Sequence, residues 1–470
     1  MLRAYFNSIK VPELRKRIIF TFGILAVCRL AANIPVPGID PEGLNALFAA
    51  LEKTNAGDGV MNMVNIFSGG ALQKFAIAAL GIMPYISASI IIQLMTPVFP
   101  ALEKLQREGD SGRQKLTQWT RYLTLVICIV QGWMLAAGME NAASLFNLSG
   151  KIQVVSDPGF MFRFTTVIIM MAGTMALMWL GEQITERGIG NGISIIITVN
   201  IISRMPEAFG QMFRLLTAPT APGEMEFTAI HLVLMIIFFL AVTAGAVLLN
   251  QGVRQIPIRY AARRAGASSP VGQTTYMPLK VNFSGVMPLI FAGAVVMFAG
   301  IILGWVSSAT AGAETGSFLD YISSGSQWLQ ANILRDNGYM VFSSLCIIVF
   351  SFFWVANQFN PVRIADDLKR GGAYVPGIRP GQPTADYIDH TMTYITVVGT
   401  LGLVILALIP HILTGSFGIP MTAAQFFGGS SMLIMVGVVL DVLRQIEANL
   451  VARHYDGFLS KGQLKGRRSS

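Results

Sequence analysis

A stretch of fifty residues, 391–440, contains no Asp, Glu, Lys or Arg. The whole chain is similarly poor in charge: 13% of its 470 residues are charged, while 53% are hydrophobic. Soluble proteins contain about 25% charged residues, because polar side chains must cover their surfaces. A soluble multidomain protein is therefore excluded, and the sequence predicts an integral membrane protein.

The same stretch is interrupted by Pro410, Gly415, Gly418 and Pro420. Since about 20 apolar residues cross a bilayer, it predicts two membrane spans joined by an outer turn. Ten spans are predicted in all, at residues 18–34, 68–97, 123–139, 164–181, 192–209, 229–250, 284–307, 339–359, 392–413 and 430–451. The predicted fold class is therefore an all-α polytopic membrane protein.

Lys and Arg gather in alternate connecting segments, beginning with Arg3, Lys10 and Arg15 before the first span. Basic loops stay on the cytoplasmic side of a membrane, so both termini are predicted to be cytoplasmic. The long loop 251–283 divides the spans into five and five. We expect an N-terminal half, 1–228, and a C-terminal half, 229–470, related as an inverted repeat around a central pathway. Within the second half, 251–283 and 360–391 are the predicted cytoplasmic loops.

The second span contains Gly81 and Pro84 in its middle. A proline removes a helical hydrogen bond, and non-helical backbone at membrane depth survives only against protein or a water-filled cavity. Two interpretations follow. Residues 68–80 form a short re-entrant helix, or the span is one tilted helix with a proline kink.

Signatures of catalysis are absent from the motifs of the chain. The four histidines are scattered, no phosphate-binding loop occurs, and Cys28, Cys128 and Cys346 are far apart within apolar runs. We expect no catalytic residues, no metal site and no cofactor. Arg29 lies inside the first span, where it either snorkels or meets a structural partner.

Two pairs of isoleucines recur at helical spacing: Ile82 with Ile86, and Ile193 with Ile197. Residues four apart share a helix face. Such pairs usually face lipid or the protein core. A ring of isoleucines, however, can form a hydrophobic constriction that resists ion leakage by dewetting.

Several long motifs resemble the SecY and Sec61-alpha family, whose bacterial members are pore subunits of the protein-export translocon. They are NIFSGGAL at 65–72, ALGIMPYISAS at 79–89, WLGEQITERGIGNG at 179–192, PLKVN at 278–282, FNP at 359–361, VPGIRPG at 375–381 and GG at 428–429. The likeness extends over nearly the whole chain.

The resemblance implies two inverted five-helix halves around an hourglass pore. It opens across the membrane for unfolded chains and sideways into lipid, between the helix that begins near Ile82 and the seventh span near 285–304. A short plug helix at about 68–80 would close it, beginning with Ser68, Gly69, Gly70, Ala71 and Leu72. The implied constriction consists of Ile82, Ile86, Ile193, Ile197, Ile290 and Ile434.

The implied partners are SecE-like and SecG-like subunits in a heterotrimer, the motor ATPase SecA, ribosomes, signal sequences of preproteins, and membrane lipids. Arg379 corresponds to a family contact for SecA and ribosomes. Arg254, Arg259, Arg263 and Arg264 keep the central loop basic, although Ala267 and Ser268 stand where many members have basic residues. The expected location is the bacterial cytoplasmic membrane.

The predicted function is a passive protein-conducting channel, driven by SecA or by ribosomal elongation. The alternative is a secondary transporter for a small solute, which shares ten spans and a broken helix. A transporter would need polar residues at the midplane, where this chain offers isoleucines. A membrane-embedded hydrolase is a third interpretation, disfavoured because no nucleophile and base can be paired.

Overall fold

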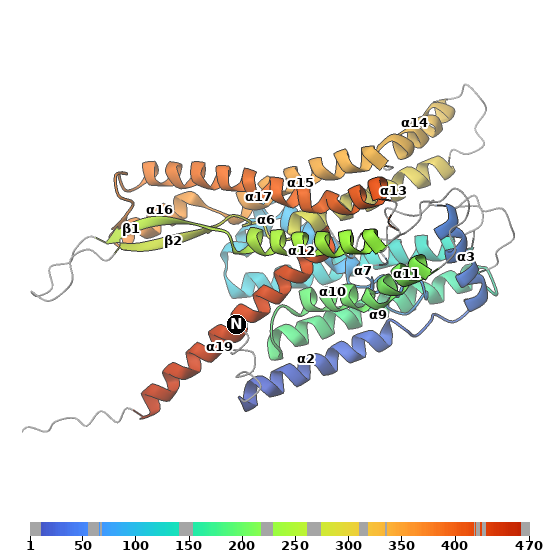
Figure 1. Cartoon of the computed structure of the whole chain (residues 1–470), viewed down its shortest axis with the longest axis horizontal. Helices are drawn as coiled ribbons and strands as arrows, with labels where there is room; N and C mark the ends of the chain where they lie inside the picture. Colours follow the sequence, from blue (N-terminus) through green and yellow to red (C-terminus); the bar gives the residue numbers. More distant parts are fainter. Residues whose placement is uncertain are drawn as a thin grey trace, which may run out of the picture. The chain divides into compact units, whose positions relative to one another are not determined.

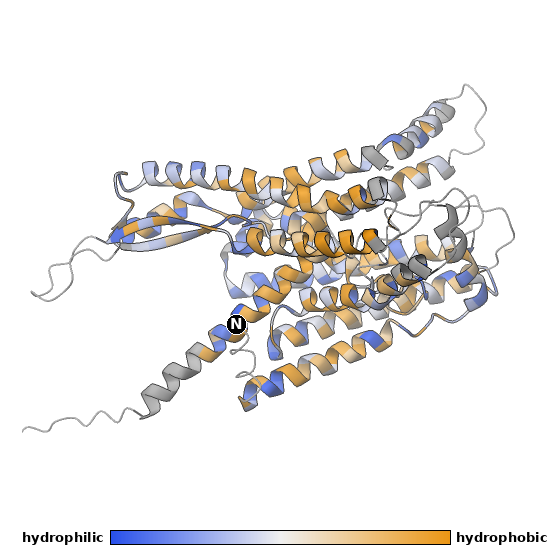
Figure 2. Cartoon of the chain, in the orientation of Figure 1, coloured by the Kyte–Doolittle hydropathy of each residue, from blue (hydrophilic) through white to orange (hydrophobic). Residues whose placement is uncertain are grey.

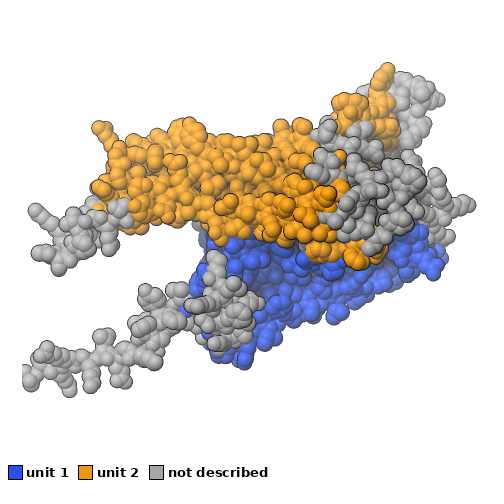
Figure 3. Space-filling model, viewed as in Figure 1, with its two compact units in different colours: residues 1–206, 434–470 blue, residues 207–433 orange. Residues whose placement is uncertain are grey.

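A computed structural model shows a helical protein (Figure 1). It describes residues 11–54, 65, 68–140, 154–217, 229–260, 274–309, 318–333, 336–417, 419, 424 and 429–461. The chain forms two compact units (Figure 3): Met1–Pro206 with Ile434–Ser470, here called unit 1, and Glu207–Leu433, called unit 2. This division does not test the predicted repeat halves, 1–228 and 229–470, which stay a prediction.

The helices of unit 1 begin with α2 (Pro12–Ala31) and α3 (Pro41–Thr54). The others are α5 (Met83–Met95), α6 (Pro100–Arg107), α7 (Asp110–Glu140), α9 (Phe160–Arg187), α10 (Gly192–Ser203) and most of α19 (Ser430–Lys461). Helix α9 is their common neighbour, because it packs against α2, α5, α7 and α10.

Every predicted span overlaps a helix, although the first half of the second span, 68–97, is formed by turns. Six described helices are long and apolar enough to cross a membrane, and the pair α5 and α6, bent by 103°, counts as a seventh. The other three predicted spans coincide with α2, with α13 (Met287–Ala309) and with α19. Figure 2 shows hydrophobic residues along the helix middles. The prediction of an all-α polytopic membrane protein is confirmed. The helices are also consistent with the predicted count of ten spans.

Helices α7 and α9 are joined by an ion pair near each end. Arg121 binds Glu182 through two hydrogen bonds of 2.6 and 3.2 Å, and Arg163 donates to Glu140 at 2.8 Å. The two pairs are 19 residues apart along both helices, from 121 to 140 and from 163 to 182. At 1.5 Å per residue this is about 28 Å, close to the hydrocarbon thickness of a bilayer. The charges therefore mark both edges of one apolar layer.

Residues 68–81, here called the turn segment, are not the predicted short helix. The structure has a succession of turns at 69–81, and the helix predicted at 68–80 is wrong. Gly69, Gly70 and Gly81 have positive φ angles, which end helical hydrogen bonding. Pro84 then stands in the first turn of α5, where proline starts a helix instead of kinking one. The tilted-helix interpretation is therefore rejected as well.

The turn segment is buried against unit 1. Leu72, Phe75 and Ala79 belong to a core cluster that also contains residues of α3, α7 and α9. Its backbone pairs with the chain after α2: Val36 N donates to the carbonyl of Phe75 at 3.0 Å, and Ile77 N donates to the carbonyl of Ile34 at 2.9 Å. Protein, not lipid, therefore satisfies this non-helical backbone.

Unit 2 is built of helices and one small sheet. Its helices are α12 (Ala229–Gln251), α13, α14 (Phe318–Ile333), α15 (Asp336–Gln358), α16 (Pro361–Arg370), α17 (Gln382–Phe417) and most of α11 (Met205–Thr217). Helix α15 packs between α13 and α17. Pro410 was expected to break the chain, but α17 continues through it to Phe417.

The sheet has the strand order β2-β1-β3, with β1 (Val253–Tyr260), β2 (Thr274–Lys280) and β3 (Ala373–Tyr374) antiparallel. This sheet was not predicted, because residues 251–283 were expected to form only a loop. Ile256 and Ile258 alternate with exposed residues along β1, the pattern of a strand with one buried face. The sheet links both predicted cytoplasmic loops into one body.

We predict that Gly173→Ala destabilises unit 1. A Cβ at Gly173 of α9 would collide with the carbonyl oxygen of Ile77 in the turn segment. Overpacking of this kind costs about 1–3 kcal/mol, which thermal unfolding in detergent would report as a lower midpoint. Gly23→Ala is the matched control, because nothing lies within 4 Å of a Cβ there. Equal midpoints for both variants would contradict this packing.

Candidate functional site

The first pair of predicted constriction residues stands at the start of α5. Ile82 is its N-cap residue, and Ile86 lies one turn later, with its backbone N–H bonded to the carbonyl of Ile82 at 3.0 Å. Gly81, with a φ of 58°, turns the chain into the helix directly before them. Both isoleucines are buried, with exposed fractions of 3% and 9%.

The second pair stands at the start of α10. The side chain of Asn191 caps this helix by accepting from the N–H groups of Ile193 and Ser194. Thr185 of α9 adds a second support: its hydroxyl donates to the carbonyl of Gly181 at 3.0 Å and accepts from the N–H of Gly192 at 2.9 Å. The start of α10, and with it Ile193, is fixed to α9.

Two distant segments hold the loop before α10. Gly190 N donates to Gln445 Oε1 of α19 at 2.8 Å, and Ile189 N donates to the hydroxyl of Thr21 in α2. Ile189 also packs with Leu14 and Ile446 in a small buried cluster. The loop that orients α10 is therefore anchored from both ends of the chain.

Five of the six predicted constriction residues are buried. Ile193 is half-buried, and Ile82, Ile86, Ile197, Ile290 and Ile434 are buried. A fully lipid-facing position is therefore excluded for the five buried residues. Five belong to unit 1, and Ile290 of α13 belongs to unit 2. That the six form one ring stays a prediction.

The five predicted plug residues form the beginning of the turn segment. Ser68 shapes it, because its hydroxyl donates to the carbonyl of Asn65 and accepts from the N–H of Leu72. Gly70 N also donates to the carbonyl of Asn65 at 3.0 Å. Ser68, Gly69, Ala71 and Leu72 are buried and Gly70 is half-buried, so this end of the segment is folded into unit 1.

Arg29 has a structural partner, as one of the two interpretations expected. Its guanidinium donates to the carbonyl of Gly69 from Nη1 and Nη2, both at 3.2 Å, and from Nη1 to Asn200 Oδ1 at 3.3 Å. Asn200 was missed by the sequence analysis. It lies within an apolar run of α10, which is a visible signal, but its partner is 171 positions away.

The predicted partner-contact residues lie on the sheet and beside it. Arg254 and Arg259 are exposed on β1, and Arg379 is exposed in the turn between β3 and α17. Arg263 and Arg264 lie outside the described residues. Val375 and Ile378 pack into the core under the sheet, and Thr384 donates to the carbonyl of Arg379 at 2.8 Å. The turn thus presents the Arg379 side chain on a fixed support.

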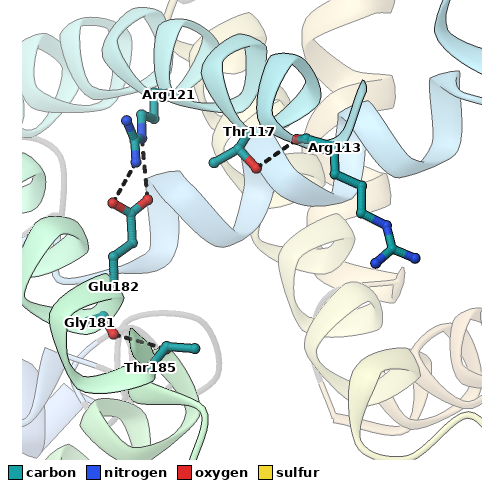
Figure 4. Close-up of polar contacts among 6 residues, drawn as sticks. All are labelled: Arg113, Thr117, Arg121, Gly181, Glu182 and Thr185. Atoms are coloured by element: carbon teal, nitrogen blue, oxygen red, sulfur yellow. Dashed lines mark hydrogen bonds and ion pairs between the residues drawn. The ribbon is translucent and has the colours of Figure 1, made fainter. Parts of the chain in front are cut away.

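The ion pair of Arg121 and Glu182 was also missed. Figure 4 shows the two side chains pointing toward one another from α7 and α9, with Gly181 directly before Glu182 and Thr185 about one turn after it. A Cβ at Gly181 would come within 3.2 Å of Ile193. The pair therefore fixes α9 at the position where α9 contacts the second isoleucine pair. The motif WLGEQITERGIGNG contains Glu182, but sequence alone does not give its partner.

In the part of the chain that the structure describes, no group of three or more His, Cys, Asp or Glu residues could bind a metal ion. Cys28, Cys128 and Cys346 are free and buried, as expected of packing residues.

A family model described as SecY matches residues 76–443. The chain belongs to the SecY family. Its relatives in that family include the protein translocase subunit SecY of Escherichia coli K12, 42% identical, with 98% of each chain covered. Those of Chlamydia trachomatis and Streptomyces coelicolor are each 40% identical, with at least 97% of each chain covered.

Solved channels share the fold. A protein-conducting channel matches with a TM-score of 0.60 at 17% identity, covering 93% of this chain and 92% of that one. The Sec61 channel of a canine ribosome–channel complex matches with a TM-score of 0.58 at 16% identity, with the same coverage. The resemblance of the sequence to the SecY family is thereby confirmed.

We predict that Thr185→Val loosens the start of α10. The substitution removes the acceptor of the Gly192 N–H and the donor to the Gly181 carbonyl. A lost hydrogen bond costs about 0.5–1.5 kcal/mol, and the unfolding midpoint should fall accordingly. Thr165→Val, which removes hydroxyl bonds only to its own helix, is the matched control. A smaller effect at Thr185 than at Thr165 would contradict this role.

Proposed function

We propose that this chain is the channel subunit of a protein translocase, and that the six isoleucines form its constriction. The observation that carries the function is the 42% identity over 463 residues to a protein translocase subunit. The fold, which is that of solved protein-conducting channels, supports it. The chain provides a passage for unfolded preproteins across the membrane and for membrane segments into the lipid.

The isoleucines suit a constriction physically. A narrow ring of branched apolar side chains excludes water and ions when no substrate is present, because a hydrophobic constriction dewets. The same side chains carry no charge and no hydrogen-bonding group, so they make no sequence-specific contact with a passing chain. Each pair stands at the start of a helix, next to a glycine turn. The two pairs can therefore shift when α5 and α10 move.

The turn segment is the proposed plug. It is buried, it consists of turns, and the neighbouring protein supports it through the β-bridge of Ala76 to Pro35 and the bonds of Arg29 to the Gly69 carbonyl. One solved SecY channel, with a TM-score of 0.56 to this chain, has a plug domain that stabilises its closed state and maintains a membrane seal. We assign the same role to residues 68–81 here.

The lateral gate is proposed between α5 and α13. Signal segments would enter it because their apolar stretch prefers lipid to an aqueous pore. The location is the cytoplasmic membrane of a bacterium, with both termini in the cytoplasm, in agreement with the basic loops.

The proposed partners follow from the family. The relatives are named subunits, which supports assembly with SecE-like and SecG-like chains, and the canine channel matched here was solved with a ribosome. Arg254, Arg259 and Arg379 are proposed to contact SecA and ribosomes, whose energy drives transport. The chain itself provides the passage and no catalysis. The small-solute transporter gains no support from the matches.

The first test is a crosslink from Ile86→Cys to a stalled preprotein, in membranes with SecA and ATP. Cys28, Cys128 and Cys346 are replaced beforehand, since all three are free thiols. We expect an efficient crosslink at position 86, because the chain passes the constriction there. Val126→Cys is the control, because Val126 is 56% exposed on α7. Crosslinking at 126 but not at 86, with stalling confirmed, would overturn the constriction.

Arg379→Glu tests the partner surface. We expect the rate of SecA-dependent translocation to fall roughly tenfold or more, because a like charge facing a complementary partner costs several kcal/mol. Arg363→Glu on α16 is the control: it is also an exposed arginine, but it lies at a helix start, where a negative charge is favourable. Equal rates for the two variants would remove Arg379 from the partner surface.

A further inference from the structure

Arg29 is a cation within an apolar span, and its guanidinium donates hydrogen bonds to neutral oxygens. It binds the carbonyl of Gly69 in the turn segment and the side-chain oxygen of Asn200 in α10. The arginine is half-buried and Asn200 is 6% exposed. A charge in such a place is costly and is retained only where it has a use. Here it ties the turn segment to two different helices.

Two further polar contacts hold the same part of the segment. Arg204, the C-cap residue of α10 and 8% exposed, donates to Gln73 Oε1 at 3.2 Å. Asn33 donates to the carbonyl of Arg29 at 2.7 Å and accepts from Lys74 Nζ at 2.6 Å. The contacts therefore reach residues 69, 73 and 74, and they come from α2, the chain just after it and α10.

The second part of the turn segment is held differently. Residues 75–77 pair through their backbone with residues 34–36, and Phe75 and Ala76 are fully buried. Phe75 has a φ of 43°, so the chain changes direction there. Polar side chains from outside the segment thus bind residues 69, 73 and 74, whereas residues 75–77 pair through their backbone with residues 34–36. Core packing contributes to both parts, through Leu72 as well as Phe75 and Ala79. Release of the first part would break the bonds from Phe75 N to the Leu72 carbonyl and from Ala76 N to the Ala71 carbonyl, but not the pairing of residues 75–77 with residues 34–36.

We propose that Arg29, Asn200 and Arg204 form a polar clamp that holds residues 68–74 closed and sets how readily they leave. This rests on the proposed role of the turn segment as the plug. The clamp consists of positioning residues. They need not touch the translocating chain. The strength of their hydrogen bonds to residues 68–74 determines the fraction of channels that are open.

The chemistry makes the clamp releasable. Asn200 and the Gly69 carbonyl are neutral, so Arg29 forms charge-assisted hydrogen bonds without the stronger attraction of a carboxylate. In an opened channel, water can replace the Gly69 carbonyl as the partner of the guanidinium. A carboxylate in place of Asn200 would hold the arginine in both states. Neutral acceptors therefore suit a contact that must break and reform.

The clamp is tested with a thiol reporter, Ala71→Cys, in the full chain within its native membrane and with Cys28, Cys128 and Cys346 replaced by Ala. Ala71 is fully buried in the closed segment. An impermeant maleimide reacts with the thiol only when residues 68–74 move out. Arg29→Met should raise this rate about tenfold or more, because a hydrogen bond to a charged group is lost.

Two glycines provide a matched pair. Gly69 and Gly70 have φ angles of 66° and 83°, so alanine is strained at both. A Cβ at Gly69, however, would collide with Arg29 Nη1 and come within 2.9 Å of Asn200 Oδ1, whereas nothing lies within 4 Å of a Cβ at Gly70. The thiol at position 71 should therefore react with maleimide much faster in Gly69→Ala than in Gly70→Ala. Equal rates for the pair would overturn the clamp.

Three more variants separate the clamp from a general loss of structure. Arg29→Lys keeps the charge but loses the planar guanidinium with its two donor nitrogens. Its maleimide reaction rate should therefore lie between those of wild type and Arg29→Met. Gln73→Met removes only the Arg204 contact and should also raise the rate, which tests the clamp even where Arg29→Met does not fold. Arg113→Met, at an exposed arginine of α7, should leave the rate unchanged.

Translocation of an intact preprotein is measured in the same membranes. If wild type translocates while Arg29→Met, Gly69→Ala and Gln73→Met all react at the Gly70→Ala rate, the clamp is wrong and the proposed function stands. If wild type does not translocate although SecA and ATP are present, the proposed function itself fails.

Discussion

The structure depends on one constraint: a backbone that leaves the helical conformation inside a membrane must find its hydrogen bonds in protein. The chain meets this constraint at residues 69–81. Three glycines and Phe75, all with positive φ angles, prevent a helix there, and residues 34–36 and Arg29 provide the missing partners. Without those partners, backbone groups of the turn segment would be buried without a hydrogen bond.

A rigid frame surrounds this segment. Helices α7 and α9 are tied near both ends by ion pairs separated by about the thickness of the hydrocarbon layer. The turn segment packs on α9 at Gly173, and the second isoleucine pair follows the loop that leaves the same helix. One helix therefore supports both the proposed plug and part of the proposed constriction.

Unit 2 combines apolar helices with a small exposed sheet. The sheet joins two loops that are about a hundred residues apart, so that Arg259 of β1 pairs with Tyr374 of β3. The exposed arginines of the proposed partner surface are thereby carried by one folded body instead of by separate loops. Core residues under the sheet, including Ile256 and Val375, connect that body to helices α15 and α17.

Composition, charge-free runs and motifs were enough to predict the class, the approximate spans and the family. Fifty residues without charge can only be membrane or core, and motifs such as WLGEQITERGIGNG are long enough to be specific. The tertiary structure decided the rest. It turned a predicted helix at 68–80 into turns, because glycine conformation and partners from residues 34–36 outweigh apolar composition. It also joined Arg29 to Asn200 and Arg121 to Glu182. Pairings over 171 and 61 positions arise from helix packing, which no local pattern records.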